Sequence, residues 1–238
     1  GVHVIRSVDQ ALALRRDLDG ARRAVVVGAG FIGCETAASL RTLGLEVTLI
    51  EPEPVPLAAA LGPQIGARVT ALHTEAGVDV RTGTGVARIL GDAGRATGVE
   101  LTDGSVLEAD VVVVGIGGYP ELNYLDGSDI TLAERSEGGG IACDSQGRTS
   151  APDVYAVGDA ANWADPEGDR HRAEHWNHTV DQAVIVAAQI LGQERPPVTV
   201  PYFWSDQYDL KIQLLGAPAP TDEVHLVDDD GRKFLAYY

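Results

Sequence analysis

The chain has 238 residues, 45% of them hydrophobic and 22% charged, which is enough apolar material for a substantial core. Its 18 Lys and Arg residues against 35 Asp and Glu residues give a net charge of −17, which makes nucleic acid and anionic membranes poor partners. No apolar run reaches the roughly 20 residues of a membrane-spanning helix and no secretory signal is visible, so we expect a cytoplasmic protein without membrane partners.

The first predicted elements are a strand and a capped helix. Residues 2–5 read Val-His-Val-Ile and predict the strand. Ser7 and Gln10 have the spacing of a capping box, which opens a helix that Gly20 ends.

A strand–helix–strand unit follows. Residues 24–27 are all apolar, as is typical of a central parallel strand buried on both faces. They run into the sequence Gly-Ala-Gly-Phe-Ile-Gly at residues 28–33, from which we expect a helix to about Leu43. A second strand over residues 46–50 ends at Glu51.

The glycine motif of this unit predicts a dinucleotide site. It follows a buried strand, opens a helix and is followed by an acidic residue at the end of the next strand. We expect Gly28 to make the tight turn, Gly30 to let the backbone approach a pyrophosphate, and Gly33 to let helix and strand pack closely. The pyrophosphate would face the N–H groups at the helix start, around Phe31 and Ile32. The alternative is a tight turn with no ligand.

Glu51 decides between the two nicotinamide dinucleotides. Its carboxylate can accept hydrogen bonds from both ribose hydroxyls and would repel a 2′-phosphate, and no arginine follows directly. NAD is therefore favoured over NADP; the alternative is a solvent-facing glutamate. Glu35 lies in the first turn of the helix, where negative charge is favourable, and the residues alone leave open whether it does more.

The remaining sequence predicts further strands and helices. We expect a short meander before a last parallel strand, because Asp103 and Gly104 mark a hairpin turn between alternating runs. Residues 119–150 are Gly-rich and loop-like. The predicted helices cover residues 63–75 and 177–191, and the predicted strands cover residues 78–81, the 86–107 meander, 110–114, 153–157, 209–215, 223–227 and 233–238.

The two cysteines do not suggest a metal or redox site. Cys34 and Cys143 are far apart and have no metal-ligand spacing, so no metal site is predicted. We expect Cys34, on the inner face of its helix, to pack as a small hydrophobe.

Four blocks of the chain together resemble the FAD-dependent ferredoxin, rubredoxin and putidaredoxin reductases. These are pyridine nucleotide-disulfide oxidoreductases, and the order and spacing of the blocks match over nearly the whole chain. The last two blocks are the more specific. The blocks read VVVGAGFIGCE, TSAPDVYAVGD, RAEHW and PYFWSDQY, at residues 25–35, 149–159, 172–176 and 201–208.

The resemblance implies an α/β protein with a Rossmann-like FAD/NAD(P)-binding fold, a β-meander insertion and the start of a small C-terminal α+β domain. It assigns residues 1–19 to the crossover from an FAD domain and residues 20–117 to the NAD-binding domain. Residues 118–195 would be the second segment of the FAD domain, and residues 196–238 part of the C-terminal domain.

Two departures from the family stand out. Its members carry a further glycine-rich loop for FAD ahead of the region matched here, whereas this sequence has one such loop, and the C-terminal domain looks cut short. We therefore expect this chain alone to bind FAD poorly or not at all. Yellow flavin absorbance at full stoichiometry would contradict that expectation.

The resemblance also implies roles for individual residues. Glu35 matches a carboxylate that orients the nicotinamide amide. Residues Gly115, Ile116 and Gly117 match the loop beside the nicotinamide cofactor.

The flavin contacts implied by the resemblance are Arg6, Gly158, Asp159 and Trp176. Asp159 would bond the ribitol and Trp176 would lie near the isoalloxazine edge. The alternatives are a turn aspartate for Asp159, packing for Trp176 and a solvated side chain for Arg6. His178 stands where the family usually has alanine.

The function that the resemblance implies is an NADH-dependent ferredoxin reductase that passes electrons through FAD to a ferredoxin or rubredoxin. The alternatives are an NADH oxidase, a nitrite-reductase-like flavin domain, or a stand-alone NAD-binding redox sensor. Because ferredoxins are usually acidic too, docking would need a local basic patch or segments outside this chain.

Overall fold

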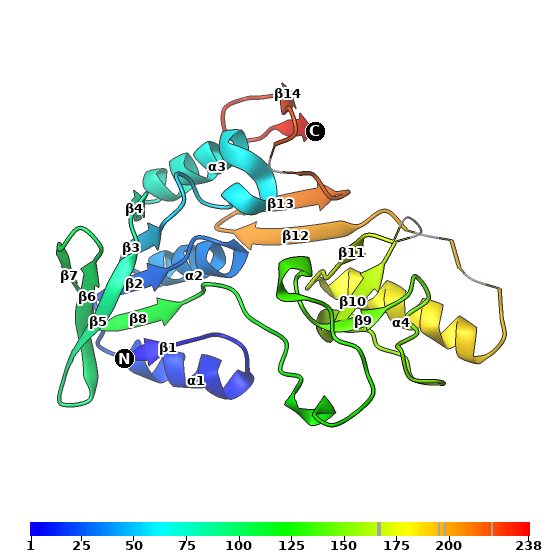
Figure 1. Ribbon diagram of the computed structural model, residues 1–238. Coiled ribbons are helices and arrows are strands. Elements are labelled where there is room, and N and C mark those ends of the chain that lie inside the picture. The colour runs from blue at the N-terminus through cyan, green and yellow to red at the C-terminus, as the bar shows by residue number, and fades with distance from the viewer. Residues whose placement is uncertain (166–167, 195, 198, 220) are drawn as a thin grey trace. The chain divides into compact units, whose positions relative to one another are not determined.

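The computed structural model describes residues 1–165, 168–194, 196–197, 199–219 and 221–238. Its residues fall into two compact units (Figure 1). Unit 1 comprises residues 1–117, 205–212 and 218–238, and unit 2 comprises residues 118–204 and 213–217. The boundary expected at residue 195 involves Arg195, which lies outside the described residues.

Unit 1 is built on a parallel sheet of five strands in the order β1-β8-β2-β3-β4. Val27 is in register with Ile50 on one side and with Val114 on the other, so the carboxyl ends of these strands share one edge. The predicted α/β fold with a central parallel sheet is confirmed. The strands are β1 (Val2–His3), β2 (Arg23–Val27), β3 (Glu46–Glu51), β4 (Asp79–Thr82) and β8 (Val111–Val114).

Three helices accompany this sheet. Helix α1 (Val8–Asp17) begins with the predicted capping box of Ser7 and Gln10. Helix α2 (Phe31–Thr42) packs on β2 and β3. Helix α3 (Ala58–Glu75) starts before the predicted position, because a turn of helix precedes a kink at Gly62, whose φ is 72° and ψ is 174°. Helix then resumes at Pro63, where proline is tolerated in a first turn.

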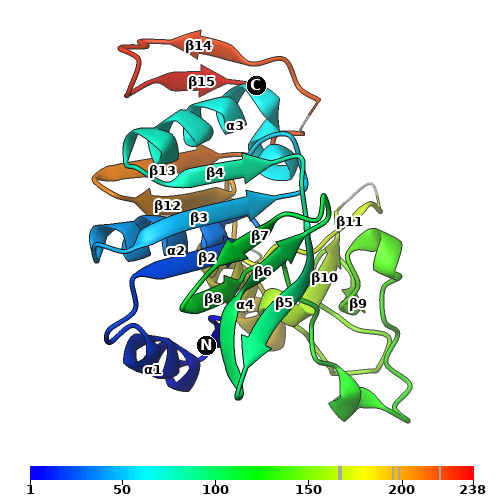
Figure 2. The same ribbon diagram turned by 90° about the vertical axis from the view of Figure 1, so that its left-hand side faces the viewer.

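The predicted three-strand meander is also confirmed. It consists of β5 (Val86–Asp92), β6 (Arg95–Leu101) and β7 (Val106–Glu108), and it covers the face of the sheet opposite α2 (Figure 2). Its apolar face packs on the sheet in one buried cluster, whose members are Val25, Ile50, Val99, Leu101, Ala109 and Val112. Burial of such side chains from water is the main force that stabilises the unit.

Unit 2 contains a small sheet of three strands and one long helix. The strand order is β11-β10-β9, and α4 (Trp176–Ile190) confirms the predicted helix. The remaining elements are η1 (Asn123–Leu125), η2 (Arg135–Glu137), β9 (Ile141–Cys143), η3 (Gly158–Ala160), β10 (Ala161–Ala164) and β11 (Arg170–His171).

Two predictions for unit 2 are wrong. Residues 119–150 are not all loop, because β9 lies among them and is fully buried. Residues 153–157 form no strand; a single bridge joins Tyr155 to Arg148. The carbonyl of Ala156 instead accepts a hydrogen bond from the indole N–H of Trp163 at 2.9 Å, and the strand follows at β10.

The C-terminal segment forms two hairpins. The first joins β12 (Tyr202–Gln207) to β13 (Leu210–Leu215), and the second joins β14 (His225–Val227) to β15 (Leu235–Tyr237). Three of these strands were predicted, whereas β12 was not. Within unit 1, Arg68 of α3 forms an ion pair with Asp229, which attaches the loop between β14 and β15 to that helix. Among the described residues, no helix is long and apolar enough to cross a membrane.

Candidate dinucleotide site

The glycine motif forms a turn that tolerates no side chain at two positions. Gly28 has φ +93°, and a Cβ there would lie 2.4 Å from the carbonyl oxygen of Gly115. A Cβ at Gly33 would lie 1.8 Å from the carbonyl oxygen of Gly28. The first turn of α2 is therefore packed directly against the turn that follows β2, as the motif predicts.

Gly30 is different, because nothing lies within 4 Å of the position that a Cβ would take. It is the N-cap of α2, and no side chain caps this helix start. The first N–H groups of a helix lack partners within the helix and attract anions. The open space beside Gly30 is therefore suited to a phosphate group, and Phe31 and Ile32 form the helix start beside it.

Glu51 holds the glycine turn from the neighbouring strand. Its Oε2 accepts a hydrogen bond from the backbone N–H of Ala29 at 2.6 Å, and its Oε1 accepts one from the N–H of Glu53 at 3.1 Å. Ala29 is completely buried, whereas Glu51 is half-buried. A carboxylate has about four acceptor sites, so Glu51 can accept further bonds from a ligand.

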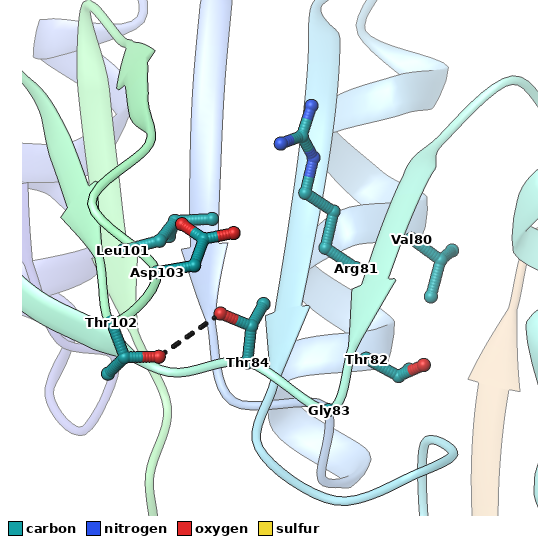
Figure 3. A pocket seen from close by; sticks show the side chains of 8 residues that line it. All are labelled: Val80, Arg81, Thr82, Gly83, Thr84, Leu101, Thr102 and Asp103. Atoms are coloured by element: carbon teal, nitrogen blue, oxygen red, sulfur yellow. Dashed lines mark hydrogen bonds between the residues drawn. The ribbon is translucent and has the colours of Figure 1, made fainter.

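A polar pocket of about 580 Å³ lies beside the strand that carries Glu51 (Figure 3). The N–H of Thr84 donates to the carbonyl of Glu51 at 3.3 Å, and the hydroxyl groups of Thr84 and Thr102 are hydrogen-bonded to each other at 3.2 Å. No sequence pattern indicated this pocket. Its lining residues are Val80, Arg81, Thr82, Gly83, Thr84, Leu101, Thr102 and Asp103.

Glu35 lies on α2 and belongs to a network of polar side chains. The hydroxyl of Ser205 donates to Oε1 of Glu35 at 2.6 Å, and Nε2 of Gln207 donates to that hydroxyl oxygen at 3.2 Å. The ring of His73 has a partner on each side. Its Nε2 lies 3.1 Å from Oε1 of Gln207, and its Nδ1 lies 2.9 Å from the hydroxyl of Tyr208. Burial lowers the pKa of His73 to about 4 and raises the pKa of Tyr208 to about 12.

The loop after β8 meets the glycine turn. The N–H of Gly115 donates to the carbonyl of Val27 at 2.8 Å, and the side chain of Ile116 is 72% exposed. Gly117, with φ +87°, ends the first stretch of unit 1. The structure thus brings the glycine motif, Glu51 and Gly115 together at one edge of the sheet. Arg6 lies in the exposed loop before α1.

The residues expected to contact flavin lie in unit 2, apart from Arg6. Gly158 has φ +78°, and its N–H donates to Oε1 of Gln182 at 2.7 Å. The guanidinium of Arg172 donates to the carbonyl of Asp159 at 3.0 Å. Trp176 begins α4 with its side chain 76% exposed, so it is not part of the core.

His178 supports the same loop. Its Nε2 lies 2.9 Å from Nε2 of Gln182, which can only donate, so this ring nitrogen accepts. Burial lowers the pKa of His178, and the neutral ring provides that acceptor. His178 therefore orients Gln182, which in turn holds Gly158.

Neither cysteine has the environment of a reactive thiol. Burial raises the pKa of Cys34 to about 12 and that of Cys143 to about 11. Cys34 is completely buried, as predicted for a residue of the core. Over the described part of the chain, no group of three or more His, Cys, Asp or Glu side chains is arranged to hold a metal ion.

Sequence reasoning assigned no role to Ser205, Gln207, His73 or Tyr208. A signal was present, because Ser205 and Gln207 occupy alternate positions of one strand and so face the same side. Two polar residues on a buried face need partners, but the sequence does not identify those partners.

Two family models match the chain. The model described as pyridine nucleotide-disulphide oxidoreductase matches residues 1–183, and the model described as reductase C-terminal matches residues 202–238.

Individual relatives agree with these matches. The chain is 42% identical over 242 residues to the 5,5′-dehydrodivanillate O-demethylase ferredoxin reductase subunit of a Sphingobium species, covering 100% of this chain and 58% of the relative. It is 40% identical over 230 residues to rhodocoxin reductase of Rhodococcus erythropolis, covering 95% and 52%. The chain therefore spans little more than half the length of these relatives.

A solved structure has the same fold. The covalent complex of putidaredoxin reductase with putidaredoxin matches with a TM-score of 0.91 at 30% identity, over 100% of this chain and 57% of the other.

Proposed function

Because the chain belongs to the pyridine nucleotide-disulphide oxidoreductase family, we propose that it is a large part, including the NAD-binding domain, of an NADH-dependent flavoprotein ferredoxin reductase. The observation that carries this proposal is the Glu51 carboxylate, which is bonded to the glycine turn at Ala29 and lies next to the start of α2. One ligand, a dinucleotide with a free ribose 2′-hydroxyl, suits both features.

NAD is the ligand that this geometry favours. The pyrophosphate would lie beside Gly30, where no protein atom occupies the space near the Cβ position. The ribose hydroxyls would donate to Glu51, whereas a 2′-phosphate would bring negative charge against that carboxylate. The pocket beside Thr84 is adjacent to Glu51 and has room for the adenine.

The nicotinamide end would lie at the opposite side of the turn. Gly115, Ile116 and Gly117 follow the strand next to β2 and would border the ring, and Glu35 would accept a hydrogen bond from the carboxamide. Residues 20–117 would therefore form the NAD-binding domain, with residues 1–19 as the crossover into it.

Unit 2 would contribute to FAD binding. We assign residues 118–195 to the second segment of an FAD domain, with Gly158 and Asp159 at the ribitol and with Arg6 and Trp176 at the flavin. The 76% exposure of Trp176 leaves its indole accessible to a ligand, as this role requires. Residues 196–238 would begin the C-terminal domain.

When bound, FAD would supply the redox chemistry that connects NADH to an iron–sulfur protein. The residues of this chain would bind and orient these groups. The partner would be a ferredoxin or a rubredoxin-like carrier, because relatives with these motifs are named ferredoxin reductases. We place the protein in the cytoplasm, where the NADH it oxidises is found.

Electron transfer in a full-length protein that contains this chain tests the proposal. NADH, a reconstituted ferredoxin and cytochrome c are combined, and cytochrome reduction is followed by absorbance. The proposal predicts NADH-dependent reduction that requires ferredoxin. No reduction, or reduction that is equally fast without ferredoxin, would refute it.

A further inference from the structure

We propose that Ser205, Gln207, His73 and Tyr208 are positioning residues, which form a one-way chain of hydrogen bonds that fixes the Glu35 carboxylate toward the nicotinamide carboxamide. The proposal rests on the proposed function, since it assumes that a nicotinamide dinucleotide binds at the glycine turn. The residues that make up this chain, together with Glu35, all belong to unit 1.

The direction of every bond follows from chemistry. The carboxylate of Glu35 accepts, so the Ser205 hydroxyl donates to it and the Ser205 oxygen accepts from the amide N–H of Gln207. The amide oxygen of Gln207 can only accept, so it accepts a hydrogen bond from Nε2–H of His73.

The bond to Gln207 fixes the tautomer of His73 and thereby the direction of the last bond. Burial lowers the pKa of His73 to about 4, so its ring is neutral near pH 7 and carries one N–H. Since Nε2 carries that proton, Nδ1 accepts, and the hydroxyl of Tyr208 donates to it. Each of the four bonds thus has one donor and one acceptor, and the chain ends on Glu35.

Burial makes this arrangement rigid. The side chains of His73, Ser205 and Gln207 have 0% exposure. Leaving a buried polar atom without a partner destabilises the fold, so each side chain is held in the orientation that pairs its polar atoms. The hydrogen bonds join α2 and α3 to β12, which is distant from both helices in sequence, and they therefore tie Glu35 to two other elements.

One oxygen of Glu35 remains available to a ligand. Ser205 donates to Oε1, whereas Oε2 has no hydrogen bond to any of the residues that the structure describes. Glu35 is half-buried and is the fifth residue of α2, so it lies just past the first turn in which the sequence placed it. This oxygen can accept a hydrogen bond from the N–H of a carboxamide. The pyrophosphate and adenosine of the ligand would be bound at other residues, beside Gly30 and Glu51.

Calorimetry with two ligands separates positioning from general damage. NADH contains the nicotinamide, whereas ADP-ribose has the same adenosine and pyrophosphate without it. We expect Ser205→Ala to weaken NADH binding by about fivefold to tenfold, the size of one hydrogen bond to a charged group, and to leave ADP-ribose binding within about twofold. The unchanged ADP-ribose affinity shows that the variant is folded.

Three further variants complete the test. Glu35→Gln should cause the same selective loss, and Ser205→Ala in that background should add little, because the two side chains act through one bond. Ser39→Ala, on the exposed side of α2, should change neither affinity. The inference is refuted if Ser205→Ala weakens both ligands equally or neither, or if Glu35→Gln leaves the preference for NADH unchanged. If the original chain binds neither ligand, the proposed function itself fails and the inference falls with it.

Discussion

The carboxylate of Glu51 accepts a 2.6 Å hydrogen bond from the backbone N–H of Ala29, so the end of β3 holds the turn after β2. Ala29 is completely buried, and its N–H would have no partner without this acceptor. Glu51 therefore has a structural task in addition to the ligand contact proposed for it.

Replacing Glu51 should reveal the structural task. We expect Glu51→Ala to lower the free energy of unfolding by about 1–3 kcal/mol, because a buried donor is left unpaired. Glu51→Gln keeps an acceptor oxygen and should lose less than half as much. Urea denaturation of the two variants measures the difference, and equal losses would show that the bond to Ala29 contributes nothing.

Two glycines of the same motif should respond in opposite ways to alanine. Gly33→Ala would place a Cβ 1.8 Å from a backbone oxygen, so we expect severe destabilisation, seen as a large fall in melting temperature. Gly30→Ala meets no atom within 4 Å and should fold with little loss, yet bind NADH weakly because its methyl group occupies the phosphate space. A Gly30→Ala variant with undiminished NADH affinity would argue against a pyrophosphate at this turn.

The buried histidine should make the protein less stable in mild acid. The pKa of His73 is about 4 in the folded chain and ordinarily 6.5, so between these values the unfolded chain binds a proton that the folded chain does not. The free energy of unfolding is therefore unaffected by His73 protonation above about pH 6.5. As the pH falls toward 4, it decreases by on the order of 3 kcal/mol.

Urea denaturation at about pH 5 and at about pH 7.5 measures this effect. The comparison is with His73→Phe, which cannot titrate and should show a smaller loss in acid. An equal loss in both proteins would assign the acid sensitivity to other groups.

Both thiols should be unreactive in the folded state. Burial raises the pKa values of Cys34 and Cys143 to about 12 and about 11, so neither forms much thiolate at about pH 8. We expect a chromogenic disulfide reagent to label no cysteine in the native protein and two after unfolding in urea. Rapid labelling of the native protein would mean that one of these helices or strands opens readily.

Local patterns predicted most of unit 1. An apolar run at residues 24–27 followed by spaced glycines is typical of a strand, a tight turn and a helix. The structure has β2 and α2 at these positions. The capping box at Ser7 and the hairpin turn at Gly104 are equally local, and both are present. Such features are decided by neighbours in the sequence, which is why they can be predicted from it.

The failures involve partners that are distant in sequence. Residues 153–157 have the composition of a strand, but their bonds go to a nearby turn and to Trp163. His73 looks like one residue of a helix face, yet its two partners lie 134 and 135 residues further along the chain. Nothing near His73 in the sequence indicates these contacts, and Ser205 could not be connected with Glu35 for the same reason.

Calorimetric titration of this chain with NADH and with NADPH tests the central claim most directly. A glycine turn with Glu51 beside it predicts saturable binding of NADH at one site per chain and binding of NADPH at least about tenfold weaker, because the 2′-phosphate meets the carboxylate. No saturable heat with NADH, or equal affinity for both dinucleotides, would contradict it.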